Sequence, residues 1–258
     1  MAHLFEAPHS IAIEGPIRAG KSTLAALLAE KIGAQRIAEP QQNPFLGRFY
    51  RGEKSAAFSA QIWFLMARYE QMCAAAEQDA KAGKQVPVVA DYLFEKDKLF
   101  ACLNLSDDEL ALYNRQYHYF RDQLPTPDLV IYLQASPEVL RTRLQRKGIP
   151  DERMISGDYL EQVVQAYEHF FFHYTASDLL VVNTDDIDFV ENNRDLQSLL
   201  RRLTEPVRGT QYFLPMSNGP ADRHRKLLHW NRKPTLRSLT RGFGPGIVQA
   251  AQRLRRAL

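Results

Sequence analysis

The sequence predicts an α/β fold in which a parallel β-sheet is covered by helices on both faces. Three observations support this prediction. Short apolar runs alternate along the chain with longer segments of helical spacing, as in chains built from strand–helix–strand units. The apolar runs are nearly continuous, which is typical of strands buried on both faces. A glycine-rich turn directly joins the first apolar run to the first helical segment.

The predicted elements begin at residue 9. The first strand is rich in β-branched residues, and the alanine- and leucine-rich helix that follows ends at Gly33. A capping box, Ser106 with Glu109, marks the start of another helix, and Ser136 followed by proline marks the start of a further one. Strands are expected at 9–14, 35–38, 86–91, 129–133 and 179–182, and helices at 21–32, 56–82, 136–146, 158–174 and 189–203.

Length and composition favour one large globular domain. The chain has 258 residues, of which 45% are hydrophobic, enough for one sizeable core. Apolar runs are too short for a transmembrane helix, and the first residues lack the pattern of a secretory signal. Two cysteines in unrelated surroundings, Cys73 and Cys102, indicate neither a disulfide framework nor a zinc site. We therefore expect a protein of the reducing cytoplasm.

Charge is distributed unevenly along the chain. Residues 216–258 contain ten Lys or Arg and one acid, whereas the preceding part is mildly acidic. We therefore expect a main domain at 1–215 and a basic C-terminal extension at 216–258. Within the extension, apolar residues at helical spacing flank arginines between 247 and 258. This segment either forms an amphipathic helix that contacts an anionic surface, or it is a solubilising extension without fixed structure.

The turn after the first strand, residues 15–22, matches the phosphate-binding pattern G-x-x-x-x-G-K-[ST]. Its glycines let backbone N–H groups surround phosphate oxygens, and the following helix adds the partial positive charge of its N-terminus. In such loops the lysine reaches the β- and γ-phosphates and the Ser hydroxyl binds Mg²⁺. Arg18 is bulkier than the small residue common at its position. The expected ATP-binding residues here are Gly15, Pro16, Ile17, Arg18, Ala19, Gly20, Lys21, Ser22 and Thr23.

The loop alone does not distinguish kinases from GTPases and ATPases. A GTPase is expected to carry an N-K-x-D segment that reads guanine, and the sequence contains none. An ATPase usually ends an apolar strand with two acids, whereas Asp91 is followed here by Tyr92. The pattern therefore favours a phosphotransferase that moves the γ-phosphate of ATP to a small acceptor.

Motifs after the loop narrow the class of acceptor. They are Glu39-Pro40, Gln61 with Arg68, Asp91-Tyr-Leu-Phe-Glu-Lys-Asp97, Ala135-Ser-Pro-Glu138, an arginine-rich segment at 141–153, and Arg208-Gly-Thr-Gln-Tyr212. With these motifs, residues 9–215 resemble the deoxyribonucleoside kinase family, especially its bacterial deoxyadenosine/deoxyguanosine kinase branch. The resemblance implies a P-loop fold with a helical lid, a homodimer, and Mg²⁺-assisted transfer from ATP to the 5′-hydroxyl of a deoxynucleoside in nucleotide salvage. Many members have arginine where this chain has Tyr92, so one phosphate-binding cation is missing.

Two acids are candidates for the acceptor chemistry. Asp91 ends a buried strand beside the phosphate loop, where a carboxylate can accept the proton of the acceptor hydroxyl. The resemblance implies that Asp91 is catalytic and that Glu39 lies near the 5′-hydroxyl and the waters of the metal, which Ser22 also binds. The alternatives are a helix-capping role for Asp91 and a structural turn role for Glu39.

The acceptor itself is assigned to a second group of residues. Gln61 and Arg68 are seven residues apart and share one face of a helix. The resemblance adds Asp97 as the partner of Arg68 and gives these three residues the task of reading the base. It also places Tyr50 and Glu152 at the 3′-hydroxyl of the sugar. A purine base is preferred because the three polar side chains match its donors and acceptors.

Lid cations complete the predicted site. Arginine forks stabilise charge on a transferring phosphoryl group, and Arg143 and Lys147 match the family best, with Arg143 also assigned to catalysis. The adenine of ATP is expected near Asp188 and Phe189. Two alternatives remain, a nucleoside monophosphate kinase of the thymidylate type and a non-catalytic P-loop interaction module. The base-reading residues disfavour the first, and the intact loop disfavours the second.

Overall fold

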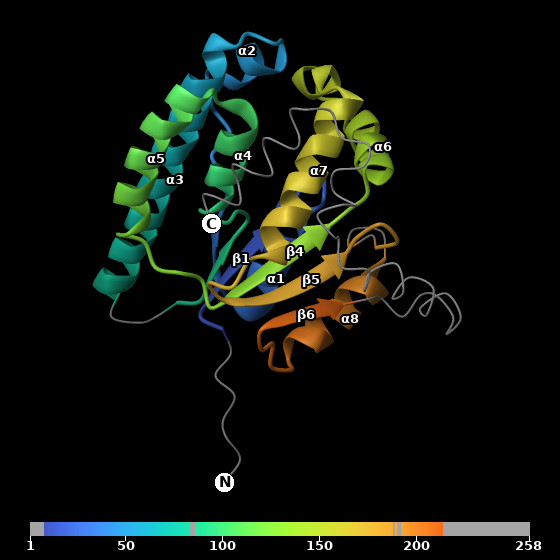
Figure 1. Cartoon of the computed structure of the whole chain (residues 1–258). Helices are drawn as coiled ribbons and strands as arrows, with labels where there is room; N and C mark the ends of the chain where they lie inside the picture. Colours follow the sequence, from blue (N-terminus) through green and yellow to red (C-terminus); the bar gives the residue numbers. More distant parts are fainter. Residues whose placement is uncertain (1–7, 83–85, 188, 190–191, 214–258) are drawn as a thin grey trace.

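The computed structural model describes residues 8–82, 86–187, 189 and 192–213. Within them, six strands form one sheet in the order β2-β3-β1-β4-β5-β6 (Figure 1), and every neighbouring pair is parallel. Asp188 and the basic segment 216–258 lie outside the described residues, so the expectations for them stay predictions. In the described part, no helix is both long enough and apolar enough to cross a membrane.

Helices connect the strands in the order that the alternating sequence predicts. The strands are β1 (Ser10–Glu14), β2 (Gln35–Ile37), β3 (Val88–Ala90), β4 (Leu129–Gln134), β5 (Asp178–Asn183) and β6 (Thr210–Phe213). The helices are α1 (Lys21–Ile32), α2 (Leu46–Tyr50), α3 (Ser55–Ala82), α4 (Lys96–Asn104), α5 (Asp107–Arg121), α6 (Pro137–Lys147), the 3₁₀ helix η1 (Asp151–Met154), α7 (Gly157–Phe172) and α8 (Asn193–Leu203).

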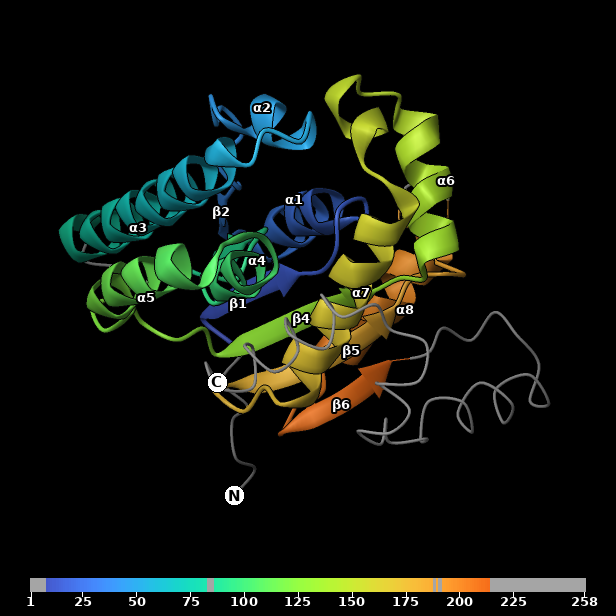
Figure 2. The same ribbon diagram turned by 45° about the horizontal axis from the view of Figure 1, so that its top comes forward.

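The core lies on both faces of the sheet. In β4, Ile131 belongs to an apolar cluster with residues of α1, α6, α7 and α8, whereas its neighbour Tyr132 belongs to a cluster with residues of α3, α4, α5 and α7. Figure 2 shows α3, α4 and α5 grouped together, with α6 beside α7. Successive strand residues point to opposite faces, so a strand covered on both sides must be apolar at nearly every position. This explains the continuous apolar runs and confirms the predicted fold class.

Local signals explain most of the helix boundaries. The Ser106 side chain accepts the Glu109 N–H and the Glu109 carboxylate accepts the Ser106 N–H, so the predicted capping box is present. The helix expected at 189–203 begins instead at Asn193, because the Asn192 side chain accepts the N–H of Arg194 and caps the helix there. The short elements α2, α4 and β6 were not predicted, since runs of four to nine residues carry weak periodic signals.

Because all strands are parallel, their carboxyl ends meet along one edge of the sheet. Glu14 ends β1, while Glu39 and Asp91 follow β2 and β3 closely. Ligands of open α/β sheets bind outside this edge. The predicted phosphate loop and both candidate acids therefore come together there.

Candidate active site

The phosphate loop connects β1 to α1 in a tight turn. A Cβ atom at Gly15 would overlap the carbonyl oxygen of Leu133, so only glycine fits there. Gly20 caps α1 with φ 106°, in the left-handed region that glycine adopts without strain. The Gly15 N–H donates to Oε1 of Glu14 at 2.8 Å, which fixes the first residue of the loop.

Lys21 lies inside this loop. Its ammonium donates to the carbonyl oxygens of Gly15 at 2.6 Å and Pro16 at 3.0 Å. Burial lowers the pKa of Lys21, and the nearby Lys96 ammonium lowers it further, while Glu14, Glu39 and Asp91 partly offset this. The ammonium is thus held where incoming phosphate oxygens can replace carbonyl groups as its acceptors.

A chain of five alternating charges runs from the phosphate loop to the acceptor side. We call it the buried charge chain, and it consists of Glu14, Lys96, Glu39, Arg68 and Asp97. Lys96 contacts Glu14 at 3.6 Å and also pairs with Glu39, while Arg68 pairs with Glu39 and donates to Asp97 at 2.6 Å. Four of the five are buried, and Glu39 keeps 26% of its side chain exposed. Unpaired charges are expensive to bury, so each member depends on its neighbours.

Two members of this chain were not identified from the sequence. Lys96 directly precedes Asp97 in the motif at 91–97, and Glu14 directly precedes the first glycine of the loop. Glu14 accepts the backbone N–H of Leu93 at 2.8 Å and the hydroxyl of Tyr167 at 2.9 Å. It therefore ties the phosphate loop to the segment after β3 and to α7. The signal was available, because a charged residue at the end of an apolar strand requires partners.

Glu39 is the acid of this edge that reaches solvent. Burial alone would raise the pKa of Glu39, but the Lys96 ammonium and the Arg68 guanidinium outweigh burial and hold it well below its usual range. Both cations contact Oε1 of Glu39, and neither contacts Oε2. Glu39 is therefore ionised, with one oxygen directed away from its two cations.

Asp91 is more enclosed. It is 1% exposed, and its Oδ2 accepts from the Arg36 guanidinium at 3.0 Å. Its Oδ1 accepts the backbone N–H of Glu39. Asp91 thus holds the segment that carries Glu39, and both of its oxygens already have protein donors.

Gln61, Arg68 and Asp97 come together as the sequence predicts. The Gln61 amide donates to the backbone carbonyl of Asp97 at 2.9 Å and also to its Oδ1, the oxygen that accepts from Arg68. The Arg68 guanidinium lies 4.6 Å from the centre of the Phe64 ring. Burial raises the pKa of Asp97, and Arg68 opposes this effect. Arg68 Nε and Asp97 Oδ2 are buried without hydrogen-bond partners among the described residues.

Tyr50 and Glu152 belong to neighbouring elements of the site. Tyr50 ends α2, Glu152 belongs to η1, and the two elements are in contact. Burial raises the pKa of Tyr50, followed by the effects of Tyr159, Glu152 and Glu39. Glu152 also forms a two-pronged ion pair with Arg18 of the phosphate loop. The elements that carry Tyr50 and Glu152 are therefore in contact, and Glu152 is bound to an arginine that was expected to serve the loop alone.

Arg143 connects α6 to the segment after β5. Its guanidinium donates to the Thr184 carbonyl at 2.6 Å, to the Ile187 carbonyl at 3.3 Å and to the Arg18 carbonyl at 3.5 Å. Beside it lies a cavity of about 540 Å³, lined by Glu138, Val139, Thr142, Arg143, Arg146, Asp185, Asp186, Ile187, Asn192 and Asp195. The sequence places adenine next to this segment. Phe189 packs in the core instead of lining the cavity, and Lys147 is exposed at the end of α6.

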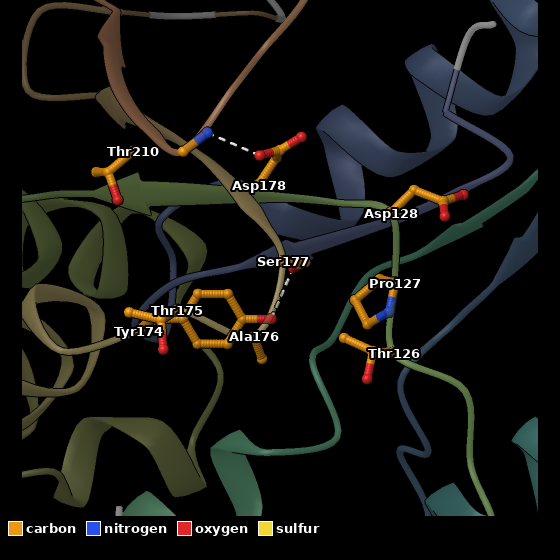
Figure 3. Close-up of a pocket in the computed structure, with 10 residues that line it drawn as sticks. Thr126, Pro127, Asp128, Tyr174, Thr175, Ala176, Ser177, Asp178 and Thr210 are labelled. Carbon is orange, nitrogen blue, oxygen red and sulfur yellow. Dashed lines mark hydrogen bonds between the residues drawn. The ribbon is translucent and has the colours of Figure 1, made fainter.

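A second hollow of about 550 Å³ lies at the opposite edge of the sheet (Figure 3), where β4, β5 and β6 begin. Two pairs of its polar groups contact one another. Asp178 accepts the Gly209 N–H at 2.7 Å, and the hydroxyls of Tyr174 and Ser177 lie 2.8 Å apart. None of the residues that line this hollow belongs to the phosphate loop. We therefore place the active site at the carboxyl edge of the sheet, where the loop lies.

Comparison with known proteins identifies the family. The family model for deoxynucleoside kinases matches residues 11–208, most of the chain. The chain belongs to the deoxynucleoside kinase family. This kinase is 38% identical over 202 residues to the deoxyguanosine kinase of Bacillus subtilis, a match that covers 76% of this chain and 97% of that protein. It is 28% identical over 213 residues to a deoxyadenosine kinase of Lactobacillus acidophilus, covering 77% and 96%.

Solved structures agree with this assignment. The deoxyadenosine kinase of M. mycoides with bound dATP superimposes on this kinase with a TM-score of 0.64 at 25% identity, covering 76% of this chain and all of that one. The same enzyme with bound dCTP gives a TM-score of 0.63. The chain is therefore a deoxynucleoside kinase that uses ATP.

The oxygens at the site are of the kind that binds Mg²⁺. The ionised Glu39 offers Oε2, and the Ser22 hydroxyl lies exposed in the first turn of α1. The described residues contain no cluster of three acidic, His or Cys side chains that could hold a metal alone. Two such oxygens fit Mg²⁺, which is usually bound by one or two protein oxygens with phosphates and water.

Proposed function

We propose that this kinase transfers the γ-phosphate of ATP to the 5′-hydroxyl of a purine deoxynucleoside. The observation that carries this proposal is the buried group Gln61, Arg68 and Asp97, joined through Arg68 to the ionised Glu39. A base held by this group would bring its sugar toward Glu39. The names of the relatives from Bacillus subtilis and Lactobacillus acidophilus support a purine acceptor.

We assign proton acceptance from the 5′-hydroxyl to Glu39. The sequence alone points to Asp91, but both Asp91 oxygens have protein donors, whereas Oε2 of Glu39 carries neither of its two cation contacts. In this proposal Asp91 positions Glu39 by accepting the backbone N–H of Glu39. Tyr50 and Glu152 bind the sugar on the opposite side.

The donor half of the site binds ATP. The backbone N–H groups of the loop and Lys21 hold the phosphates, and Arg143 lies between the loop and the cavity proposed for adenine. Ser22 would hold Mg²⁺ directly and Glu39 would hold it through metal-bound water, and the ion would neutralise charge on the β- and γ-phosphates. We still propose that Asp188 lies near the adenine of ATP and that Lys147 stabilises the transferred phosphoryl group. Phe189 supports this region from the core. We propose that the enzyme acts in cytoplasmic nucleotide salvage, where Cys73 and Cys102 stay reduced.

Base preference follows from the two partnerless atoms. Arg68 Nε can donate to N7 of adenine or guanine, and Asp97 Oδ2 can accept from the exocyclic amine that adenine carries beside N7. The methyl group of thymine gains nothing from this polar wall. We expect deoxyadenosine or deoxyguanosine to exceed thymidine in kcat/KM by about tenfold or more, because leaving buried polar groups without partners costs about 1–3 kcal/mol.

Specificity constants for the four deoxynucleosides measure this preference. Deoxycytidine is the acceptor whose kcat/KM we expect to differ least from those of the purines, since it also presents an amine beside a ring nitrogen. Replacing Asp97 with Asn in a parallel set should reduce the preference. If thymidine exceeds both purines tenfold in the unaltered enzyme, the assignment of Gln61, Arg68 and Asp97 to the base is wrong.

We further propose that the enzyme is a homodimer. The helices α3 and α5 lie side by side in Figures 1 and 2. On them, Met66, Leu112 and Tyr119 are 47%, 50% and 67% exposed. Apolar side chains that are exposed together on neighbouring helices of one subunit are typical of a surface that a partner subunit covers.

Light scattering should therefore give about twice the chain mass of 29.6 kDa at micromolar concentration. Leu112→Glu should shift the mass toward the monomer. Ile32→Glu, which alters an exposed apolar residue of α1, should not. A monomeric unaltered enzyme would contradict the proposal.

A further inference from the structure

Arg18 has an unusual backbone conformation for its residue type. Its φ is 64°, and it is the single non-glycine residue with positive φ among the described residues. For residues with a Cβ atom, the left-handed region costs about 1–2 kcal/mol. Glycine would avoid this cost, so the side chain of Arg18 must offer a compensating interaction.

That interaction joins the phosphate loop to the lid. Nε of Arg18 donates to Oε2 of Glu152 at 2.8 Å, and Nη2 donates to Oε1 at 2.6 Å. The two side chains are 23% and 16% exposed, so water screens the pair only partly. Bidentate guanidinium–carboxylate pairs fix the geometry of both partners. Glu152 therefore has one preferred position relative to the loop.

The backbone of Arg18 is bound as well. Its carbonyl oxygen accepts from the Arg143 guanidinium of α6. One loop residue thus contacts two lid elements, η1 through its side chain and α6 through its carbonyl group. A change in the position of this residue would be transmitted to both.

Glu152 faces the acceptor wall. Its element η1 contacts α2, which ends at Tyr50. The Glu152 carboxylate raises the pKa of Tyr50 and the Arg18 guanidinium lowers it, so the three groups lie close together. Without Arg18, the Glu152 carboxylate would lose its two donors and be able to turn toward solvent.

We propose that Arg18 is a positioning residue of the acceptor site, and that it holds Glu152 beside Tyr50 so that recognition of the sugar 3′-hydroxyl depends on an arginine of the phosphate loop. The inference rests on the proposed role of Glu152 at that hydroxyl. Arg18 acts through Glu152 and need not touch the nucleoside.

The test compares a purine deoxynucleoside with its 2′,3′-dideoxy counterpart. The ratio of the two kcat/KM values measures recognition of the 3′-hydroxyl. Arg18→Gly and Glu152→Gln are each expected to lower this ratio by about tenfold, the size of one lost charge-assisted hydrogen bond. The double variant should lower it no further, because both changes remove the same interaction. Arg18→Lys should fall between, since lysine lacks the two-pronged geometry.

Arg18→Gly is well suited to this test because glycine adopts a φ of 64° without strain. Its melting temperature should not fall below that of the unaltered enzyme, so a changed ratio cannot be ascribed to unfolding. Glu53→Gln is the matched control. It breaks an exposed pair with Arg48 of α2 at 2.7 Å and should leave the ratio unchanged.

The outcomes separate the inference from the proposed function. If Glu152→Gln lowers the ratio and Arg18→Gly does not, the role of Arg18 is refuted while that of Glu152 stands. If neither variant lowers it, Glu152 does not recognise the hydroxyl, and both ideas fail. If Arg18→Gly lowers kcat equally for both substrates with the ratio unchanged, Arg18 acts on the transferred phosphoryl group, which also refutes the inference.

Discussion

Lys21→Ala should reduce phosphoryl transfer by about 10³-fold or more, since a single preorganised donor to developing charge already contributes about 10²–10³-fold. Lys21 is enclosed by the loop and donates to two of its carbonyl groups. No other side chain of the loop can place an ammonium there. Release of ADP in a coupled assay with a deoxynucleoside acceptor measures the loss.

The fold should survive this change. Burial and Lys96 lower the pKa of Lys21, so at neutral pH the charged side chain opposes folding, and its removal should not reduce the melting temperature. Lys31→Ala, an exposed change in the last turn of α1, is the matched control. Near-normal turnover in Lys21→Ala would refute the assignment of the phosphate loop.

Glu39→Gln should lower kcat by about 10²–10⁴-fold, as expected when a general base is lost. The KM for the nucleoside should change little, because the Gln61 amide keeps its hydrogen bonds to Asp97. Glutamine preserves the size of the side chain, so the effect reports the charge. Steady-state kinetics on both substrates separate kcat from KM.

Asp91→Asn tests the alternative assignment. We expect a loss in kcat of about 10²-fold, smaller than that of Glu39→Gln, because Asp91 acts through the Glu39 backbone and the Arg36 guanidinium. A larger loss in Asp91→Asn than in Glu39→Gln would return proton acceptance to Asp91. A change confined to KM would make Asp91 a binding residue.

The main elements of the fold were predictable because their signals are local. The boundaries of α1 agree with the sequence, since Gly20 and Gly33 bound it and alanine and leucine fill it. The short α4 was not predictable, although it carries Lys96 and Asp97. Its nine residues pack by tertiary contacts, which a single sequence does not display.

The proximity of some candidate site residues was predictable, whereas most contacts between them were not. Gln61, Arg68 and Asp97 meet as expected, whereas the pairing of Arg18 with Glu152 spans 134 positions and has no local signal. Asp91 and Glu39 could not be ranked from the sequence either. Their order depends on which carboxylate oxygens have donors, and this follows from backbone positions in two separate strands.

The buried charge chain restricts how this enzyme can change its substrate. Arg68 donates to Asp97, on the side of the base, and to Glu39, at the reacting hydroxyl. An exchange of Arg68 that suits a different base would therefore also release the acid at the phosphorylated end of the sugar. New base preferences, whether selected in nature or engineered, should arise together with slower turnover unless a second substitution restores a cation beside Glu39. Active variants with a new base preference should therefore carry two substitutions. We expect the second, compensating substitution at Lys96 or at a residue next to it.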